Sequence, residues 1–158
     1  MLYKKQLTKE QALQKLRHYC GYQERCHSEV KEKLFDLAVK RNEHDEIIST
    51  LIEENYLDEE RFAIQFAGGK FRIKQWGKKK IKYELKQKQI SNYSINKALQ
   101  SIDKDLYRKT LQKLAIQKLK TLKSENNVFV KKQKLYTYLL QKGFEQDIVA
   151  ETIPVVMR

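Results

Sequence analysis

Apolar side chains recur along this chain at intervals of three and four residues, the spacing that gathers them on one face of an α-helix. Thr8, followed three residues later by Gln11, fits a capping box at the start of the first such stretch, and Gly21 fits its end. The apolar positions between these signals are Ala12, Leu13, Leu16, Tyr19 and Cys20. The pattern therefore predicts an amphipathic helix near the N-terminus.

Two further helices are predicted before residue 58. Ser28 is a candidate cap for a helix that carries Leu34 on its apolar face. Asp45 is a candidate cap for a shorter helix with apolar residues at 47, 48, 51 and 52, and Asn55 is a plausible end for it. Three short helices thus account for the first third of the chain.

The same three-helix pattern then appears twice more. The predicted starts are Asp58, Gly77, Ser91 or Asn92, about Asp105, and Asn126 or Asn127. Gly143 is predicted to end the eighth helix, and the last helix is predicted to lie before Pro154. Gly68 and Gly69 fall inside the helix that follows Asp58, where each costs roughly 1 kcal/mol relative to Ala, so we expect this helix to kink or end early.

The second helix of each round shares a local pattern. Leu85-x-x-Lys88-x-Ile90 matches Leu139-x-x-Lys142-x-Phe144, and Leu34 begins the corresponding stretch of the first round. The period is about 50 residues, which is typical of tandem helical repeats that bury their apolar faces on one another. We therefore expect an all-α protein of about nine helices in three tandem three-helix repeats, with boundaries at residues 1–57, 58–104 and 105–158.

Composition agrees with a folded, strongly hydrated helical protein. The 158 residues include five glycines and one proline, 34% are charged and 41% are hydrophobic, and the mean hydropathy is −0.74. No apolar run is long enough to span a membrane and residues 1–10 lack a secretory signal, so we expect a cytoplasmic protein with no membrane partner. Cys20 and Cys26 are expected to be reduced thiols.

The net charge of +13 is unevenly distributed. Residues 1–63 contain 11 Lys and Arg against 13 Asp and Glu, a balance of −2, whereas residues 64–158 contain 22 against 7, a balance of +15. Such an asymmetry indicates a polyanionic partner, either nucleic acid or an acidic protein surface. The competing interpretation is a lysine-rich protein whose charges only solvate ordinary helices.

One stretch resembles a known family. The run Tyr56-Leu57-Asp58-Glu59-Glu60-Arg61-Phe62-Ala63 is similar to the most recognisable segment of the RecX family, an aromatic-Leu-Asp-acidic-x-Arg-Phe-Ala sequence. Similar segments flank it: Leu13, Leu16, Glu24-Arg25, Ser28-Glu29-Val30 and Leu34 upstream, and Gly77, Ile81, Glu84-Leu85 and Lys88-Gln89-Ile90 downstream. The last repeat matches through Leu139, Lys142-Gly143-Phe144 and Ile148. Gln89 departs from the family, which usually has Gly at this turn.

The resemblance implies an elongated, curved module of three-helix repeats. It also implies a partner, the RecA filament on single-stranded DNA, in whose groove the protein would bind and block filament growth, strand exchange and ATP turnover. No catalytic residues and no cofactor come with it. Two other classes of function stay open: a general helical DNA-binding protein whose basic repeats contact duplex DNA, and a scaffold for an unrelated acidic protein.

The basic run from Lys70 to Lys88 is the leading candidate for partner contact. It holds nine Lys and Arg and a single acid, Glu84, interleaved with aromatic residues that can stack on bases. A second basic region runs from Arg108 to Lys142, with ten Lys and Arg. The predicted partner and nucleic-acid contacts are Lys70, Arg72, Lys74, Trp76, Lys78, Lys79, Lys80, Lys82, Lys131, Lys132 and Lys134. The alternative is a solvated lysine face with Trp76 packed in the core.

Enzyme and metal signatures are missing from the sequence. His18, Cys20, Cys26 and His27 are close together, but a C-x5-C spacing is not one that structural zinc sites use. There is no glycine-rich phosphate loop, G-x-S-x-G or H-E-x-x-H motif. We therefore expect no catalytic residue, no metal, no cofactor and no small-molecule substrate.

Overall fold

The computed structural model describes residues 6–158, and this part of the chain contains nine α-helices, one π-helical turn and no β-strand. In chain order the elements are α1 (Lys9–Tyr22), α2 (His27–Asp36), α3 (Arg41–Glu53), α4 (Glu59–Gly69), η1 (Lys70–Lys74), α5 (Lys78–Gln87), α6 (Asn92–Gln100), α7 (Lys104–Thr121), α8 (Val128–Gln141) and α9 (Gln146–Val156). The expectation of an all-α fold is confirmed.

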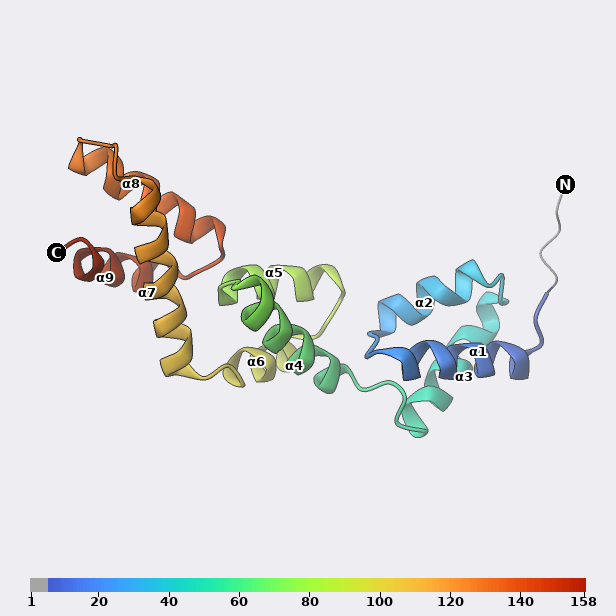
Figure 1. Ribbon diagram of the computed structural model, residues 1–158. Coiled ribbons are helices and arrows are strands. Elements are labelled where there is room, and N and C mark those ends of the chain that lie inside the picture. The colour runs from blue at the N-terminus through green and yellow to red at the C-terminus, as the bar shows by residue number, and fades with distance from the viewer. Residues whose placement is uncertain (1–5) are drawn as a thin grey trace, which may run out of the picture.

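The helices pack in three consecutive groups of three. The most extensive contacts between helices fall within α1–α3, within α4–α6 and within α7–α9, which we call repeats 1, 2 and 3. Figure 1 shows the repeats following one another in a row, with α1 and α9 at opposite ends of an elongated molecule. The predicted tandem arrangement is thus confirmed.

The turn that follows the second helix has the same geometry in all three repeats. Leu34, Leu85 and Leu139 are fully buried, and each carbonyl accepts a hydrogen bond, at 3.1 to 3.2 Å, from the N–H five residues later. The residue before that N–H is left-handed: Ala38 has φ 56°, Gln89 has φ 63° and Gly143 has φ 99°. Gln89 therefore makes the turn that the family usually makes with Gly, although a side chain is strained there.

Several predicted helix ends are confirmed and others are wrong. Thr8 forms the capping box, and Asp58, Ser91 and Asn127 cap their helices through their side chains. Ser28 does not cap α2. Cys26 stands at that position, and the Glu29 carboxylate accepts its N–H.

The start of α3 and the ends of α1 and α9 also differ from expectation. Helix α3 begins at Arg41 rather than after Asp45, because the buried His44 ring bonds the Val39 carbonyl and holds this turn in the core. Helix α1 continues through Gly21 to Tyr22. Helix α9 continues through Pro154, which lies in the last turn and so removes a single N–H from the helix.

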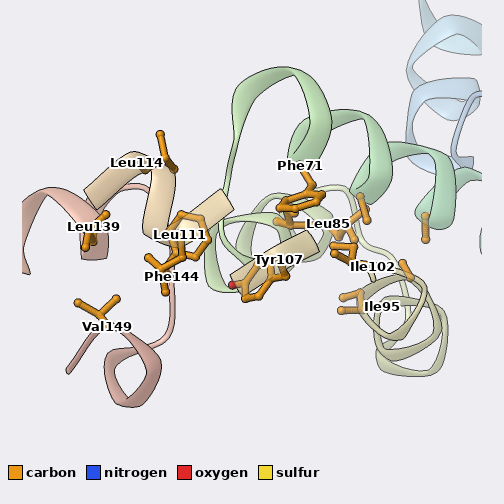
Figure 2. Close-up of a cluster of buried hydrophobic side chains, with 14 of the residues drawn as sticks. Phe71, Leu85, Ile95, Ile102, Tyr107, Leu111, Leu114, Leu139, Phe144 and Val149 are labelled. Atoms are coloured by element: carbon orange, nitrogen blue, oxygen red, sulfur yellow. The ribbon is translucent and has the colours of Figure 1, made fainter. Parts of the chain in front are cut away.

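Two hydrophobic cores run along the molecule. Repeat 1 has its own core, formed by α1, α2 and α3 around Leu16, Leu34 and Leu51. Repeats 2 and 3 share one continuous core, and Cys26 is the single residue of repeat 1 that belongs to it. In Figure 2 Tyr107 of α7 lies between Phe71 and Leu85 of repeat 2 and Phe144 of repeat 3, and its ring centroid is 5.6 Å from that of Phe71 and 5.2 Å from that of Phe144.

Candidate polyanion-binding surface

Helix α4 ends at Gly69, in agreement with the early end expected from Gly68 and Gly69, but the chain stays helical beyond it. The helical path widens into the π-turn η1, and Gln75, with φ 56°, ends it. The wider turn keeps Phe71 in the core while Arg72 and Lys74 remain exposed. The chain then folds back, so that the Trp76 N–H donates to the Lys70 carbonyl at 3.3 Å. Residues that the sequence separates by six positions are therefore neighbours.

Lysines and aromatic rings alternate in a series of contacts on repeat 2. The Lys70 ammonium lies 5.1 Å from the Trp76 ring centroid and 5.4 Å from that of Phe66. Lys80 lies 4.7 Å from the Trp76 ring and Lys88 lies 5.7 Å from the Phe66 ring. These are cation–π distances. We call Phe66, Lys70, Trp76, Lys80 and Lys88 the lysine–aromatic strip.

Trp76 itself is half-buried and packs against the shared core, so one part of its ring is structural while two ammonium groups approach the rest. The packing that the sequence offered as the alternative is therefore observed, and contact of Trp76 with a partner stays a prediction. The single Trp of the chain anchors the strip to the core and orders the two flanking lysines.

A third cation reaches this end of the strip from another repeat. The Lys142 ammonium, on the turn between α8 and α9, donates to the Lys74 carbonyl at 2.8 Å. Burial lowers the pKa of Lys142, and the charges of Lys80 and Lys74 lower it further. Lys74, Lys80 and Lys142 thus form a cluster of mutually repelling charges that an anion would relieve. Lys142 was absent from the predicted contacts; its repeat position, shared with Lys88, was the available signal.

The first turn of α5 concentrates positive charge where a helix favours negative charge. Lys78, Lys79 and Lys80 occupy it without an acidic residue, although the positive end of the helix dipole lies there. Its N–H groups are satisfied by repeat 3: that of Lys78 donates to the Tyr107 hydroxyl at 2.9 Å, and that of Lys79 to the Gly143 carbonyl at 2.9 Å. The Tyr107 hydroxyl in turn donates to Glu145, and burial together with this bond raises the pKa of Tyr107.

The remaining predicted contacts are not all equivalent. Arg72, Lys74, Lys79 and Lys82 are exposed. The Lys78 ammonium lies over the Tyr107 ring at 4.9 Å, so it is half-buried beside repeat 3 rather than free alongside Lys79 and Lys82.

The basic residues of α8 form a separate group. Lys132 lines a groove with Phe129 and Tyr136, and Lys131 is half-buried. Lys134 makes a salt bridge with Glu125 at 3.5 Å, which partly neutralises it. Within residues 6–158, no hydrogen bond or salt bridge joins Lys131, Lys132 or Lys134 to the strip.

In the part of the chain that the structure describes, no cluster of three or more His, Cys, Asp or Glu side chains could hold a metal ion. None of the helices in residues 6–158 has the length and apolar character needed to cross a membrane.

Comparison with known proteins places these repeats in a family. The family profile described as the second three-helix domain of RecX matches residues 58–99, and the profile of the third three-helix domain matches residues 105–153. A regulatory protein RecX of Chlorobium phaeobacteroides is 30% identical over 138 residues, which are 87% of this chain and 88% of that protein. One of Clostridium botulinum strain Eklund 17B is 34% identical over 126 residues, which are 79% of this chain.

The chain spans 58% and 60% of the length of the two Clostridium botulinum relatives that it matches. Among solved structures, the crystal structure of RecX from Lactobacillus salivarius is 27% identical, with a TM-score of 0.85 over 94% of this chain and 96% of that one. A second RecX crystal structure shares the fold, with a TM-score of 0.83 and 21% identity. By these matches, the chain belongs to the RecX family of regulatory proteins.

Proposed function

We propose that this protein regulates homologous recombination by binding the RecA filament on single-stranded DNA, without catalysing a reaction itself. Binding would inhibit filament growth, strand exchange and ATP turnover. Family membership supports the class of regulator. The observation that carries the molecular proposal is the lysine–aromatic strip with the adjoining cluster of Lys74, Lys80 and Lys142, which crosses from repeat 2 to repeat 3.

The charges of this surface conflict with local stability, which supports a functional role. Three lysines at the positive end of α5 oppose the helix dipole, by roughly 0.3–1 kcal/mol each at low salt. The depressed pKa of Lys142 shows a second unfavourable arrangement nearby. Departures from local rules are expected at functional sites. A bound phosphate or carboxylate would turn both into favourable interactions.

The elongated shape suggests how inhibition would arise. A filament repeats its protomers along an axis and presents acidic and DNA phosphate groups in its groove. A row of three helical repeats can contact more than one protomer at once (Figure 1). Contacts that bridge neighbours would oppose the relative motion that ATP turnover requires.

The test is a RecA ATPase assay on single-stranded DNA with purified protein. We expect inhibition at a ratio of protein to recombinase far below one, because one bridging molecule blocks a growing filament. The triple variant K70Q/K80Q/K142Q should lose most of this inhibition. The matched control K109Q/K113Q/K120Q removes three exposed charges from α7 and should retain it.

The same variants separate the filament regulator from a general DNA-binding protein. A DNA-binding protein would inhibit only at the concentration that coats the DNA, and the triple variant would lose free-DNA affinity and inhibition in parallel. If the triple variant and its control inhibit equally, the strip is a solvated face and this surface proposal is wrong.

A further inference from the structure

Repeat 1 contains a groove lined by basic and aromatic residues, although residues 1–63 as a whole carry a slightly negative charge. It lies between α1 and α2 and encloses about 500 Å³, which is within the size range of small-molecule sites. Its lining residues are Gln14, Lys15, His18, Tyr19, Tyr22, Arg25, Lys33 and Leu37. No acidic side chain lines it, although residues 1–63 carry more acids than bases.

Among the residues that the structure describes, the basic residues on the α1–α3 side of repeat 1 pair with acidic side chains, whereas the lysines that line the groove do not. On the α1–α3 side, Lys9 pairs with Glu46, and Arg17 makes two short hydrogen bonds to Glu54, of 2.7 and 2.6 Å. Within residues 6–158, neither Lys15 nor Lys33 makes a salt bridge with an acidic side chain. The charges that line the groove are therefore available to an external anion.

Aromatic groups complete the groove. The Arg25 guanidinium lies 3.8 Å from the Tyr19 ring centroid, and its Nε donates to the Tyr19 carbonyl at 3.1 Å, so the cation is held in place. The Lys33 ammonium lies 5.4 Å from the same ring. Tyr22 is 79% exposed at the end of α1, which leaves its ring free for stacking. An arginine and lysines beside open rings match a planar base attached to a phosphate.

We propose that the α1–α2 groove is a nucleotide-binding site, in which Tyr22 stacks on a base while Lys15, Arg25 and Lys33 hold the phosphate. The nucleotide unit can belong to a single strand or be free. This site is separate from the lysine–aromatic strip, and it lies in the repeat whose net charge gives no sign of anion binding.

The experiment measures binding of two probes, a 5′-phosphorylated hexathymidylate and thymidine 5′-monophosphate, by calorimetry. It uses the full chain carrying K70Q/K80Q/K142Q, so that the strip contributes little. We expect K15Q/K33Q in this background to weaken hexathymidylate binding about tenfold. The slope of log affinity against log salt should become shallower by up to about 1.4, the value for two phosphate contacts on a single strand.

The matched control K31Q/K40Q removes two exposed charges from the same repeat outside the groove and should leave affinity unchanged. Y22L keeps an apolar side chain at an exposed position and should weaken binding by a similar factor through lost stacking. A free nucleotide is the ligand if the monophosphate binds as tightly as the hexamer; otherwise the ligand is a strand.

Equal losses in K15Q/K33Q and K31Q/K40Q would overturn the proposal, as would polyglutamate that competes as well as the hexamer. These outcomes are independent of the strip. A failed filament assay with intact groove binding would remove the proposed function and leave this site in place.

Discussion

The two junctions between repeats use equivalent segments, but different groups make their hydrogen bonds. In both, the N-terminus of the second helix of one repeat meets the turn after the second helix of the next. At the junction of repeats 2 and 3 this contact is made by two hydrogen bonds between main chains: the Gly77 N–H donates to the Lys142 carbonyl at 2.8 Å and the Lys79 N–H to that of Gly143 at 2.9 Å. At the junction of repeats 1 and 2 a side chain replaces them, since the Ser28 hydroxyl donates to the Lys88 carbonyl at 2.9 Å.

Two glycines account for the difference. A Cβ at Gly77 would overlap main-chain atoms of Gly143 and Phe144, and a Cβ at Gly143 would lie 2.8 Å from the Lys80 nitrogen. The equivalent positions at the other junction are Cys26 and Gln89, which have side chains, so the two backbones stay apart. Close approach lets repeats 2 and 3 share one core, whereas repeat 1 contributes Cys26 alone to it.

In these tandem repeats, the helices and their apolar faces determine which turns meet. The absence of a Cβ atom at Gly77 and at Gly143 then determines whether two repeats share one core. We expect repeats 2 and 3 to unfold together and repeat 1 to detach at a lower free-energy cost.

The largest expected effect is at Gly143. Gly143→Ala adds a Cβ against Lys80 and puts a side chain at φ 99°. Overpacking and left-handed strain together should lower the free energy of unfolding of repeats 2 and 3 by about 2–5 kcal/mol. Urea denaturation followed by Trp76 fluorescence measures it. Gly69→Ala is the control, because nothing lies within 4 Å of its Cβ and its φ of −65° is helical, so this variant should be slightly stabilised. Similar curves for the two variants would contradict the role assigned to the close approach.

The opposite junction is best weakened at Arg61. Its Nε donates to Glu24 at 2.7 Å, and its other nitrogens donate to the side chain and carbonyl of Asn55 at 3.0 and 3.1 Å. The other Glu24 oxygen is buried without a partner, so Arg61→Met leaves a poorly solvated carboxylate and should cost about 1–3 kcal/mol. We expect proteolysis between α3 and α4 to accelerate while the Trp76 unfolding transition stays in place. A shift of that transition as large as for Gly143→Ala would mean that the two junctions are equally coupled.

These two junctions also show how far the sequence could predict the molecule. The all-α fold, the three repeats and the equivalent positions of Leu34, Leu85 and Leu139 followed from periodicity, because spacing fixes which residues face inward. Periodicity could not predict the π-turn, which brings Trp76 back beside Lys70, or the contact of Lys142 with Lys74. Both depend on how the repeats pack, and a local pattern does not contain that information. The basic run was visible in the sequence, but the groove in repeat 1 was hidden by the surrounding acids.

The two cysteines report on junction opening separately from repeat unfolding. Cys26 is buried at the junction, whereas Cys20 is buried in the core of repeat 1 itself. Burial raises the pKa of both thiols, that of Cys20 to about 11, so neither reacts appreciably before the protein opens. If the junction opens first, a disulfide reagent should label Cys26 about tenfold faster than Cys20, which corresponds to roughly 1.4 kcal/mol. Single-cysteine variants give the two rates, and equal rates would show that repeat 1 unfolds as it detaches.

The smallest expected effect tests whether backbone strain or contact with the neighbouring repeat distinguishes the turn at Gln89 from the turn at Ala38. Gln89 is left-handed at φ 63°, so Gln89→Gly relieves about 1–2 kcal/mol of strain and loses roughly 0.5–1 kcal/mol to backbone entropy, a net stabilisation of about 0–1.5 kcal/mol. Ala38→Gly, at φ 56° in the equivalent turn of repeat 1, which makes no hydrogen bond to another repeat within residues 6–158, should give a similar gain through local strain alone. The free energies of unfolding of the two variants, and the Cys26 labelling rate, measure this. Cys26 keeps its Cβ in both, so its labelling rate should fall little. A much slower rate in Gln89→Gly than in Ala38→Gly would mean that the Gln89 side chain, and not Cys26, holds the first junction apart.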